Sequence, residues 1–223
     1  AITFLDSVDS TNTLALRGGP DGAVFVAETQ SAGRGRRGNA WESAPGLGLW
    51  FSIRLQGPLP GLGFAAALAV RDAVAPGALL AVKWPNDLLC RERKVCGILV
   101  EQRDGWAALG IGLNVHHRPE DFPPALRYRA GSLESTTDRP WDRGILLGAL
   151  LDRLDRMIGR LRQGEYDAVR TEWIDACGIV GRYIRRSNIA GRVTAVDRDG
   201  ALLVQTPSGV HRLDGGEIYI AGG

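Results

Sequence analysis

The chain has 223 residues, 44% hydrophobic and 23% charged, which is typical of a globular protein with one large domain or a domain plus a small module. Its 27 basic and 25 acidic residues give a net charge of +2, which argues against binding nucleic acid through an overall positive field. No apolar run approaches the roughly 20 residues of a membrane span, and no signal peptide precedes the first strand, so we expect a cytoplasmic protein.

The N-terminal half is predicted to contain six strands and two helices. Its first helix begins at Ser10 or Thr11, either of which can serve as N-cap, and ends at Gly18-Gly19. An alanine-rich helix over 61–75 ends at Pro76-Gly77. The apolar and β-branched runs predict strands over 1–8, 23–29, 47–55, 79–84, 94–103 and 106–115.

The C-terminal half is predicted to hold two helices and a small β module. Residues 116–140 contain four prolines and no periodicity, which indicates a long surface loop. From Asp142 an apolar stripe recurs at helical spacing, at Leu147, Leu150, Leu151, Leu154, Met157, Ile158 and Leu161. A second helix spans Glu165 to Ala176. After about residue 181, short strands joined by glycine-containing turns indicate a small barrel, so we predict an α+β domain over 1–180 and a β module over 181–223.

Three cysteines cannot all pair within one chain, and no CxxC spacing occurs. Cys90 and Cys96 flank a turn and could face each other across a hairpin, but free buried thiols in a reducing compartment are the favoured interpretation. The three histidines lack zinc-ligand spacing beside the cysteines, so no structural metal is expected.

The segment Ser31–Trp41, "SAGRGRRGNAW", is named the arginine loop here. It combines three glycines with three arginines, Arg34, Arg36 and Arg37. Taken alone, such a loop is either a solvated basic turn or a cradle in which glycine N–H groups and guanidinium groups close on a carboxylate or phosphate.

Three further stretches carry residues suited to chemistry. "KWPNDLL", from Lys83 to Leu89, is either a simple β-turn or a group of polar side chains that orients a substrate. Lys94 opens an apolar strand, where a lysine either extends to water or directs its charge into a cleft. Gly97 would allow a ligand to approach the backbone, and in "GIGLNV" Asn114 stands where the strand ends.

Together these motifs resemble those of the biotin protein ligases, and the arginine loop with KWPND is highly specific for that family. The resemblance covers nearly the whole chain. The matching motifs are DSTN, Q-x-AGRGRRG-x-x-W, KWPND, RK-x-x-GILVE, G-x-G-x-N and GGEI, at 9–12, 30–41, 83–87, 93–101, 110–114 and 215–218.

The resemblance implies a fold and a reaction. The fold is a mixed sheet packed with helices, like that of class II aminoacyl-tRNA synthetases, followed by an SH3-like barrel. The reaction joins biotin and ATP, with Mg²⁺ bridging the phosphates, into biotinyl-5′-adenylate, and then acylates a lysine of a biotin carboxyl carrier domain. Two anions meet in the first step, so positioned cations and N–H groups are required more than an acid–base pair.

The resemblance also assigns roles residue by residue. The expected catalytic residues are Lys94, Arg34, Arg36 and Asp87, where Asp87 either contacts magnesium or orients Lys94. The expected biotin site comprises Ser10, Thr11, Asn12, Gln30, Arg34, Gly35, Arg36, Trp41, Lys94 and Gly97. The expected nucleotide side comprises Arg37, Asn86, Gly112 and Asn114, together with Asp87 and the loop over 116–140.

The chain departs from the fuller family pattern in two ways. No helix-turn-helix domain precedes the motifs, so we expect a ligase without a DNA-binding role. Asn39 and Ala40 stand where relatives often have further basic residues, which makes Asn39 a poor candidate for a phosphate contact. We expect no nucleic-acid or membrane partner and leave a homodimer open. The alternatives are a lipoate–protein ligase of the same fold and a nucleic-acid-binding module.

Overall fold

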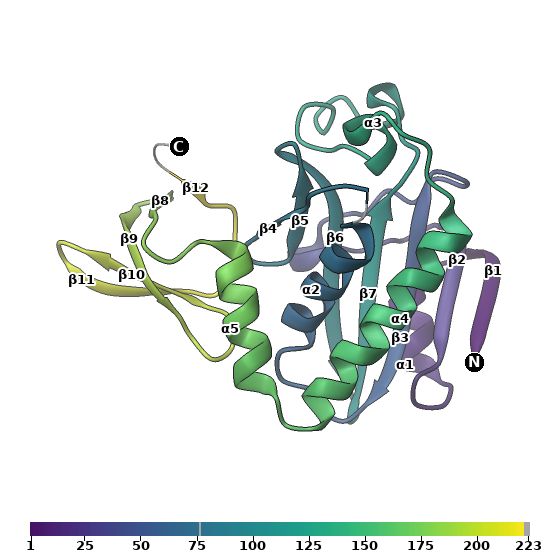
Figure 1. The fold of residues 1–223 in the computed structure, drawn as a ribbon, viewed down its shortest axis with the longest axis horizontal. Helices are drawn as coiled ribbons and strands as arrows, with labels where there is room; N and C mark the ends of the chain where they lie inside the picture. The colour runs from purple at the N-terminus through teal and green to yellow at the C-terminus, as the bar shows by residue number, and fades with distance from the viewer. Residues whose placement is uncertain (76, 221–223) are drawn as a thin grey trace.

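The computed structural model describes residues 1–75 and 77–220, which form two sheets and five α-helices (Figure 1). The larger sheet has the strand order β1-β2-β3-β7-β6-β5-β4. Only β1 and β2 run parallel, and the other neighbours are antiparallel. The strand bounds are β1 Ile2–Val8, β2 Val24–Gln30, β3 Gly48–Gln56, β4 Ala81–Lys83, β5 Asp87–Cys90, β6 Arg93–Arg103 and β7 Trp106–Asn114.

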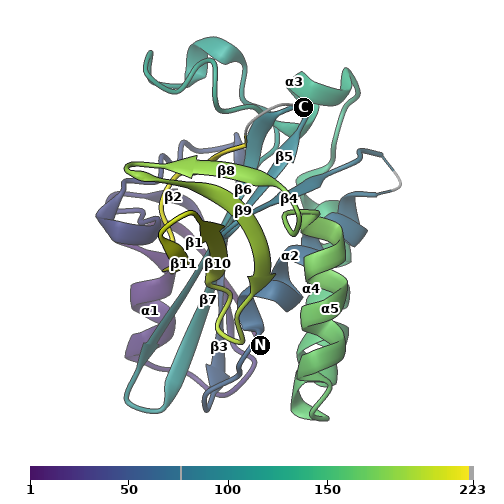
Figure 2. The same cartoon turned by 90° about the vertical axis from the view of Figure 1, so that its left-hand side faces the viewer.

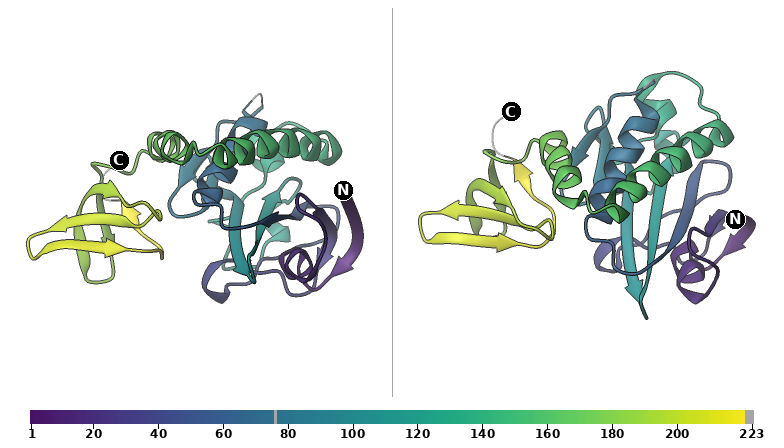
Figure 3. Two further views of the ribbon diagram at one scale, coloured as in Figure 1. Left: turned by 90° about the horizontal axis from the view of Figure 1, so that it is seen from below. Right: turned by 60° about the horizontal axis from the view of Figure 1, so that its bottom comes forward.

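Helices cover both faces of this sheet. The longer helices α2 and α4 lie on one face and α1 on the other (Figure 3, left). The short helix α3 stands at one end of the molecule, above β5 and β6 (Figure 1). The α-helices span α1 Thr11–Arg17, α2 Leu62–Val74, α3 Leu133–Thr137, α4 Arg143–Arg162 and α5 Tyr166–Cys177, and two 3-10 turns span η1 Arg36–Gly38 and η2 Pro119–Asp121.

The core lies between the sheet, α2 and α4. Ala65, Ala66 and Ala69 of α2 are fully buried, and their small side chains let α2 lie close to its neighbours. The apolar stripe predicted from 142 onward faces this core, with Leu150 and Leu154 almost completely inaccessible to solvent. Burial of this stripe packs α4 against α2, which lies on the sheet.

The smaller sheet has the strand order β11-β10-β9-β8-β12 and is antiparallel throughout. Figure 2 looks onto this sheet, with the seven-stranded sheet behind it. Its strands are β8 Tyr183–Arg186, β9 Ile189–Val196, β10 Leu202–Thr206, β11 Gly209–Leu213 and β12 Tyr219–Ile220. This small antiparallel sheet agrees with the predicted SH3-like module, although within the described residues β11 and β12 are its edges and no closed barrel is formed.

The α+β class is confirmed, whereas one local prediction is wrong and another is refined. The segment 116–140 is not a structureless surface loop, because it contains η2 and α3 and buries Leu133 and Thr136. Its helix starts at a capping box between Ser132 and Ser135. Of the stretch 83–89, interpreted as either a β-turn or a group of polar side chains that orients a substrate, residues 84–86 form a turn, whereas 87–89 belong with Cys90 to the paired strand β5.

Other predictions at element ends are refined. Ser10 occupies the N-cap position of α1, but its side chain makes no capping hydrogen bond. Cys90 and Cys96 are free and buried: Cys96 pairs with Leu88 across the hairpin, and Cys90 pairs with Arg93. The helix stop predicted at Pro76 falls outside the described residues, while α2 ends at Val74.

Among the described helices, none combines the length and the apolar character that crossing a membrane requires.

Replacing Leu154 by Ala should destabilise the fold, because it leaves a cavity beneath α4. The free energy of unfolding should fall by about 2–5 kcal/mol in urea denaturation. Ile145→Ala on the same helix is the matched control: its side chain is 77% exposed, so the change should stay under about 0.5 kcal/mol. Equal losses from the two variants would contradict the assignment of the buried face.

Candidate active site

A cavity of about 260 Å³ lies between the arginine loop and the faces of β6 and β7. Its walls come from distant parts of the chain, including the start of α1, the KWPND segment and the end of the smaller sheet. Of the site residues predicted from the sequence, those that line it are Ser10, Thr11, Asn12, Gln30, Arg34, Gly35, Arg36, Arg37, Trp41, Asn86, Asp87, Lys94, Gly97 and Gly112.

One end of the cavity is a buried network of neutral polar groups. The Oε1 atom of Gln30 accepts from the N–H and the hydroxyl of Thr11, at 2.9 and 3.1 Å. The Gln30 amide donates to Ser43 Oγ at 2.8 Å, and Ser52 Oγ lies 2.7 Å from Thr11 Oγ1 and 2.6 Å from Asn12 Oδ1. Ser43 and Ser52 belong to none of the recognised motifs, so sequence reasoning missed them.

Glycines on β6 and β7 make room for two larger side chains. A Cβ atom at Gly97 or Gly112 would overlap the indole ring of Trp41, and one at Gly110 would overlap the side chain of Asn12. The sequence predicted that Gly97 leaves space for a ligand, whereas here the space above Gly97 and Gly112 holds Trp41. The ring thereby forms an apolar wall of the cavity.

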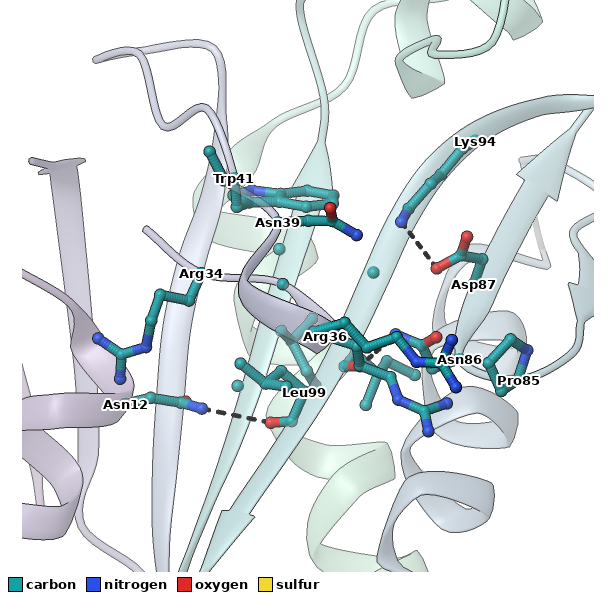
Figure 4. A pocket seen from close by; sticks show the side chains of 18 of the residues that line it. Asn12, Arg34, Arg36, Asn39, Trp41, Pro85, Asn86, Asp87, Lys94 and Leu99 are labelled. Atoms are coloured by element: carbon teal, nitrogen blue, oxygen red, sulfur yellow. Dashed lines mark hydrogen bonds and ion pairs between the residues drawn. The ribbon is translucent and has the colours of Figure 1, made fainter. Parts of the chain in front are cut away.

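The other end of the cavity carries an ion pair. Lys94 Nζ lies 2.7 Å from Asp87 Oδ1, and the ammonium group lies 5.2 Å from the centroid of the Trp41 ring (Figure 4). The Lys94 backbone is fixed as well, because its N–H donates to Arg129 O and its carbonyl accepts from Gly131 N–H, at 2.8 and 2.9 Å. The Lys94 side chain therefore extends from a backbone that is already fixed in place.

Asn86 and Asn114 are both predicted to face a nucleotide, but only Asn86 lies at the cavity. Asn86 lines the cavity, and its side-chain amide donates to Ile98 O at 2.7 Å. Asn114 is buried, does not line the cavity and donates to Gly131 O at 2.9 Å. Asn114 therefore fixes the segment that supports Lys94.

The arginine loop is held from two sides. Arg34 forms an ion pair with Glu101 of β6 at 3.2 Å. Its guanidinium points away from the Lys94–Asp87 pair, toward Asn12 (Figure 4). Arg34 is therefore turned away from the charged end of the cavity.

Arg36 and Arg37 meet the smaller sheet. Arg36 donates to Asp214 O at 3.1 Å, and Arg37 forms an ion pair with the Asp214 carboxylate at 3.3 Å. Burial, and then the charge of Arg37, lower the pKa of the Arg36 guanidinium below its ordinary value. Gly216 and Glu217 also line the cavity, so the β module contributes directly to the site.

No cluster of three or more His, Cys, Asp or Glu side chains suited to a metal ion occurs among residues 1–75 and 77–220. The cavity itself is lined by cations, amides and hydroxyls around a space of small-molecule size.

Comparison with known proteins identifies the family. Residues 4–117 match the model of the biotin/lipoate A/B protein ligase family, and residues 182–220 match the biotin protein ligase C-terminal domain. The chain belongs to this family. The resemblance predicted from the motifs is thereby confirmed.

Individual relatives cover nearly the whole chain. The chain is 32% identical over 234 residues to the bifunctional ligase/repressor BirA of Bacillus subtilis, covering 97% of this chain and 72% of the relative. It is 32% identical over 246 residues to the biotin–[acetyl-CoA-carboxylase] ligase of Paracoccus denitrificans, covering 98% and 100%. The solved biotin protein ligase of Aquifex aeolicus, in complex with biotin and ATP, matches with a TM-score of 0.84 and 28% identity, covering 98% and 97%.

The family's C-terminal domain is anchored here by the KWPND motif itself. Trp84 is buried, and its indole N–H donates to Gly200 O, in the turn before β10, at 2.7 Å. Tyr166 and Arg170 of α5 also donate to carbonyls of the smaller sheet, at Arg198 and Val196. The sheet that supplies Asp214 is therefore tied to the strand that precedes Asn86 and Asp87.

Replacing Trp84 by Phe should loosen the smaller sheet, because the Gly200 carbonyl loses its donor inside a buried junction. The opening free energy of amides in 198–217 should fall by about 1–3 kcal/mol, measured by hydrogen exchange. Trp141→Phe is the matched control, since Trp141 donates to Thr137 within the larger part of the molecule. Unchanged protection in Trp84→Phe, or an equal loss in both variants, would contradict this anchoring.

Proposed function

We propose that the chain is an ATP-dependent biotin protein ligase. It forms biotinyl-5′-adenylate and pyrophosphate from biotin and ATP, and then transfers biotin to a lysine of a carrier domain. The observation that carries the proposal is the cavity's polarity: neutral hydroxyl and amide groups line one end, and Lys94 and Arg36 face the other. A ligand with a neutral ring system and a carboxylate tail fits that order.

The neutral end suits the ureido ring of biotin, which has two donors and one acceptor. Ser10, Thr11 and Gln30 supply a hydroxyl pair and an amide beside it, and their network is already oriented by Ser43 and Ser52. The glycine-seated ring of Trp41 supplies the apolar contact for the thiophane ring and the carbon tail.

The charged end suits the attack of a carboxylate on phosphorus. A bond forms between a biotin carboxylate oxygen and the α-phosphorus of ATP, and the bond to the pyrophosphate oxygen breaks, so pyrophosphate leaves with the electron pair. Lys94 and Arg36 reduce the repulsion between the two anions. They also stabilise the negative charge that builds up on the phosphoryl oxygens. Asp87 holds Lys94 in place, and Arg34 acts as an anchor of the loop.

The nucleotide side is assigned to Asn86, Gly112 and Arg37, which all line the cavity. ATP enters as its Mg²⁺ complex, which is a substrate and not a resident group. Asn114 acts at a distance, by holding the segment 129–131 against Lys94.

The transfer step needs an approach for the acceptor lysine. A groove of about 870 Å³ adjoins the cavity and shares Arg36, Asn86 and Leu99 with it. It runs between the start of α2 and the turn at 198–200. We propose that the lysine of a biotin carboxyl carrier domain enters here, attacks the acyl carbon and releases AMP. The three free cysteines suit a reducing compartment, so we place the enzyme in the cytoplasm.

The direct test incubates the protein with biotin, ATP, Mg²⁺ and a carrier domain and measures the carrier by mass spectrometry. The carrier lysine should gain one biotinyl group, and lipoate in place of biotin should give no modification. Modification by lipoate alone would assign the chain to lipoate ligation. No modification with either acid would overturn the proposal.

Replacing Lys94 by Ala should reduce adenylate formation about 10²–10³-fold, because one preorganised cation is lost. The measurement is biotin-dependent ATP–pyrophosphate exchange, with circular dichroism to verify the fold. Arg103→Ala removes a cation from the exposed end of the same strand and should leave exchange within about twofold. An unchanged rate in a folded Lys94→Ala variant would show that Lys94 only extends to solvent.

A further inference from the structure

Glu101 lies near the end of β6, opposite Ala108 of β7. Its carboxylate accepts from the side-chain amide of Asn12 at 2.8 Å and pairs with the guanidinium of Arg34 at 3.2 Å. The Glu101 side chain is 30% exposed and the Arg34 side chain 37%, so solvent screens this pair only in part. Glu101 thus joins the start of α1 to the arginine loop.

Behind Glu101 runs the hydrogen-bonded network of the cavity's neutral end. Asn12 is turned so that its oxygen accepts from Ser52 Oγ at 2.6 Å while its nitrogen donates to Glu101. Ser52 also contacts Thr11, whose hydroxyl and N–H reach Gln30. The network therefore extends from the residue before the arginine loop to Arg34 within it, and Glu101 is the single charged acceptor along this path.

The position of Arg34 depends on that acceptor. Arg34, Arg36 and Arg37 carry like charges within four consecutive residues, which favours separation of their side chains. Among the described ion pairs, Glu101 is the acidic partner of Arg34, and the guanidinium is turned away from Arg36 toward Asn12 (Figure 4). The carboxylate fixes this end of the loop, while Asp214 fixes the other.

We propose that Glu101 is a positioning residue that keeps the arginine loop closed over the neutral end of the cavity, acting through Arg34 and Asn12. The inference rests on the proposed function, because the ligand retained there is biotin. Glu101 lies outside the reacting groups, so it governs the capture of biotin and leaves the rate of the chemical step unchanged.

Glu101→Gln tests the role with little change of shape. The amide oxygen of Gln can still accept from Asn12, whereas the ion pair with Arg34 is lost. In biotin-dependent ATP–pyrophosphate exchange, the KM for biotin should rise about three- to fivefold and kcat should stay within about twofold. Asp21→Asn is the control, since it removes a similarly exposed pair with Arg162, and the KM for biotin should not change.

Exchanging the charges of Arg34 and Glu101 distinguishes a positioning role from a general loss of structure. The double variant Arg34→Glu/Glu101→Arg restores an ion pair of opposite polarity, and the Asn12 amide can turn over to present its oxygen to the new guanidinium. The KM for biotin should return to within about 1.5-fold of the parent, while Arg34→Glu alone should remain impaired. A Glu101→Gln variant with parental KM, a fall in kcat alone, or no recovery in the double variant would overturn the inference.

Failure of the proposed function gives a different result from failure of this inference. If the parent shows no biotin-dependent exchange, the ligase assignment is wrong. If the parent is active and Glu101→Gln matches it in both KM and kcat, only the role of Glu101 is wrong.

Discussion

Charge compensation of a short loop underlies the architecture of this site. Three guanidinium groups within four residues repel one another, and glycines on either side give the backbone little stiffness of its own. The larger sheet supplies Glu101 for Arg34, and the smaller sheet supplies Asp214 for Arg36 and Arg37. Because the two acids come from different sheets, the loop covers the cavity only when both sheets are in place.

The KWPND motif supports this arrangement of the arginine loop through two sets of contacts. Trp84 faces the junction and binds the backbone of Gly200, so it fixes the sheet that carries Asp214. Asn86 and Asp87 face the cavity, where Asn86 donates a hydrogen bond to β6 and Asp87 forms the ion pair with Lys94. The KWPND turn thus fixes both the smaller sheet, which anchors the arginine loop, and Lys94, which the loop faces. The C-terminal module is in this sense part of the active site.

The sequence predicted the elements and most of the cavity lining, because apolar periodicity and contiguous motifs are local signals. The strand β5 was missed because Pro85-Asn86-Asp87 is typical of a turn, and its pairing with β6 depends on a hairpin formed around Arg91 and Glu92. Helix α3 was missed because its evidence is a single capping box in a proline-rich segment.

The support of the site was harder to predict than its lining. The contact between Asn12 and Glu101 joins residues 89 positions apart, and Ser52 contributes from a third element. Asn114 shares the alternation of Gly110 and Gly112, but its end of the strand is covered by residues 129–131, so its amide binds Gly131 and not the cavity. Such outcomes depend on which segments meet in space, and no local pattern carries that information.

We expect ligand binding to complete the closure of the arginine loop. Its ion pairs are partly exposed and each contributes about 0.2–1 kcal/mol, so the empty loop should open often, whereas a bound anion adds compensating charge from within the cavity. Trypsin cuts after exposed arginines, and its cleavage rates after Arg34, Arg36 and Arg37 measure this opening directly. We expect rapid cleavage of the free protein and at least about tenfold slower cleavage with biotin and ATP. Equal cleavage rates in the two states would contradict closure of the loop by its ligand.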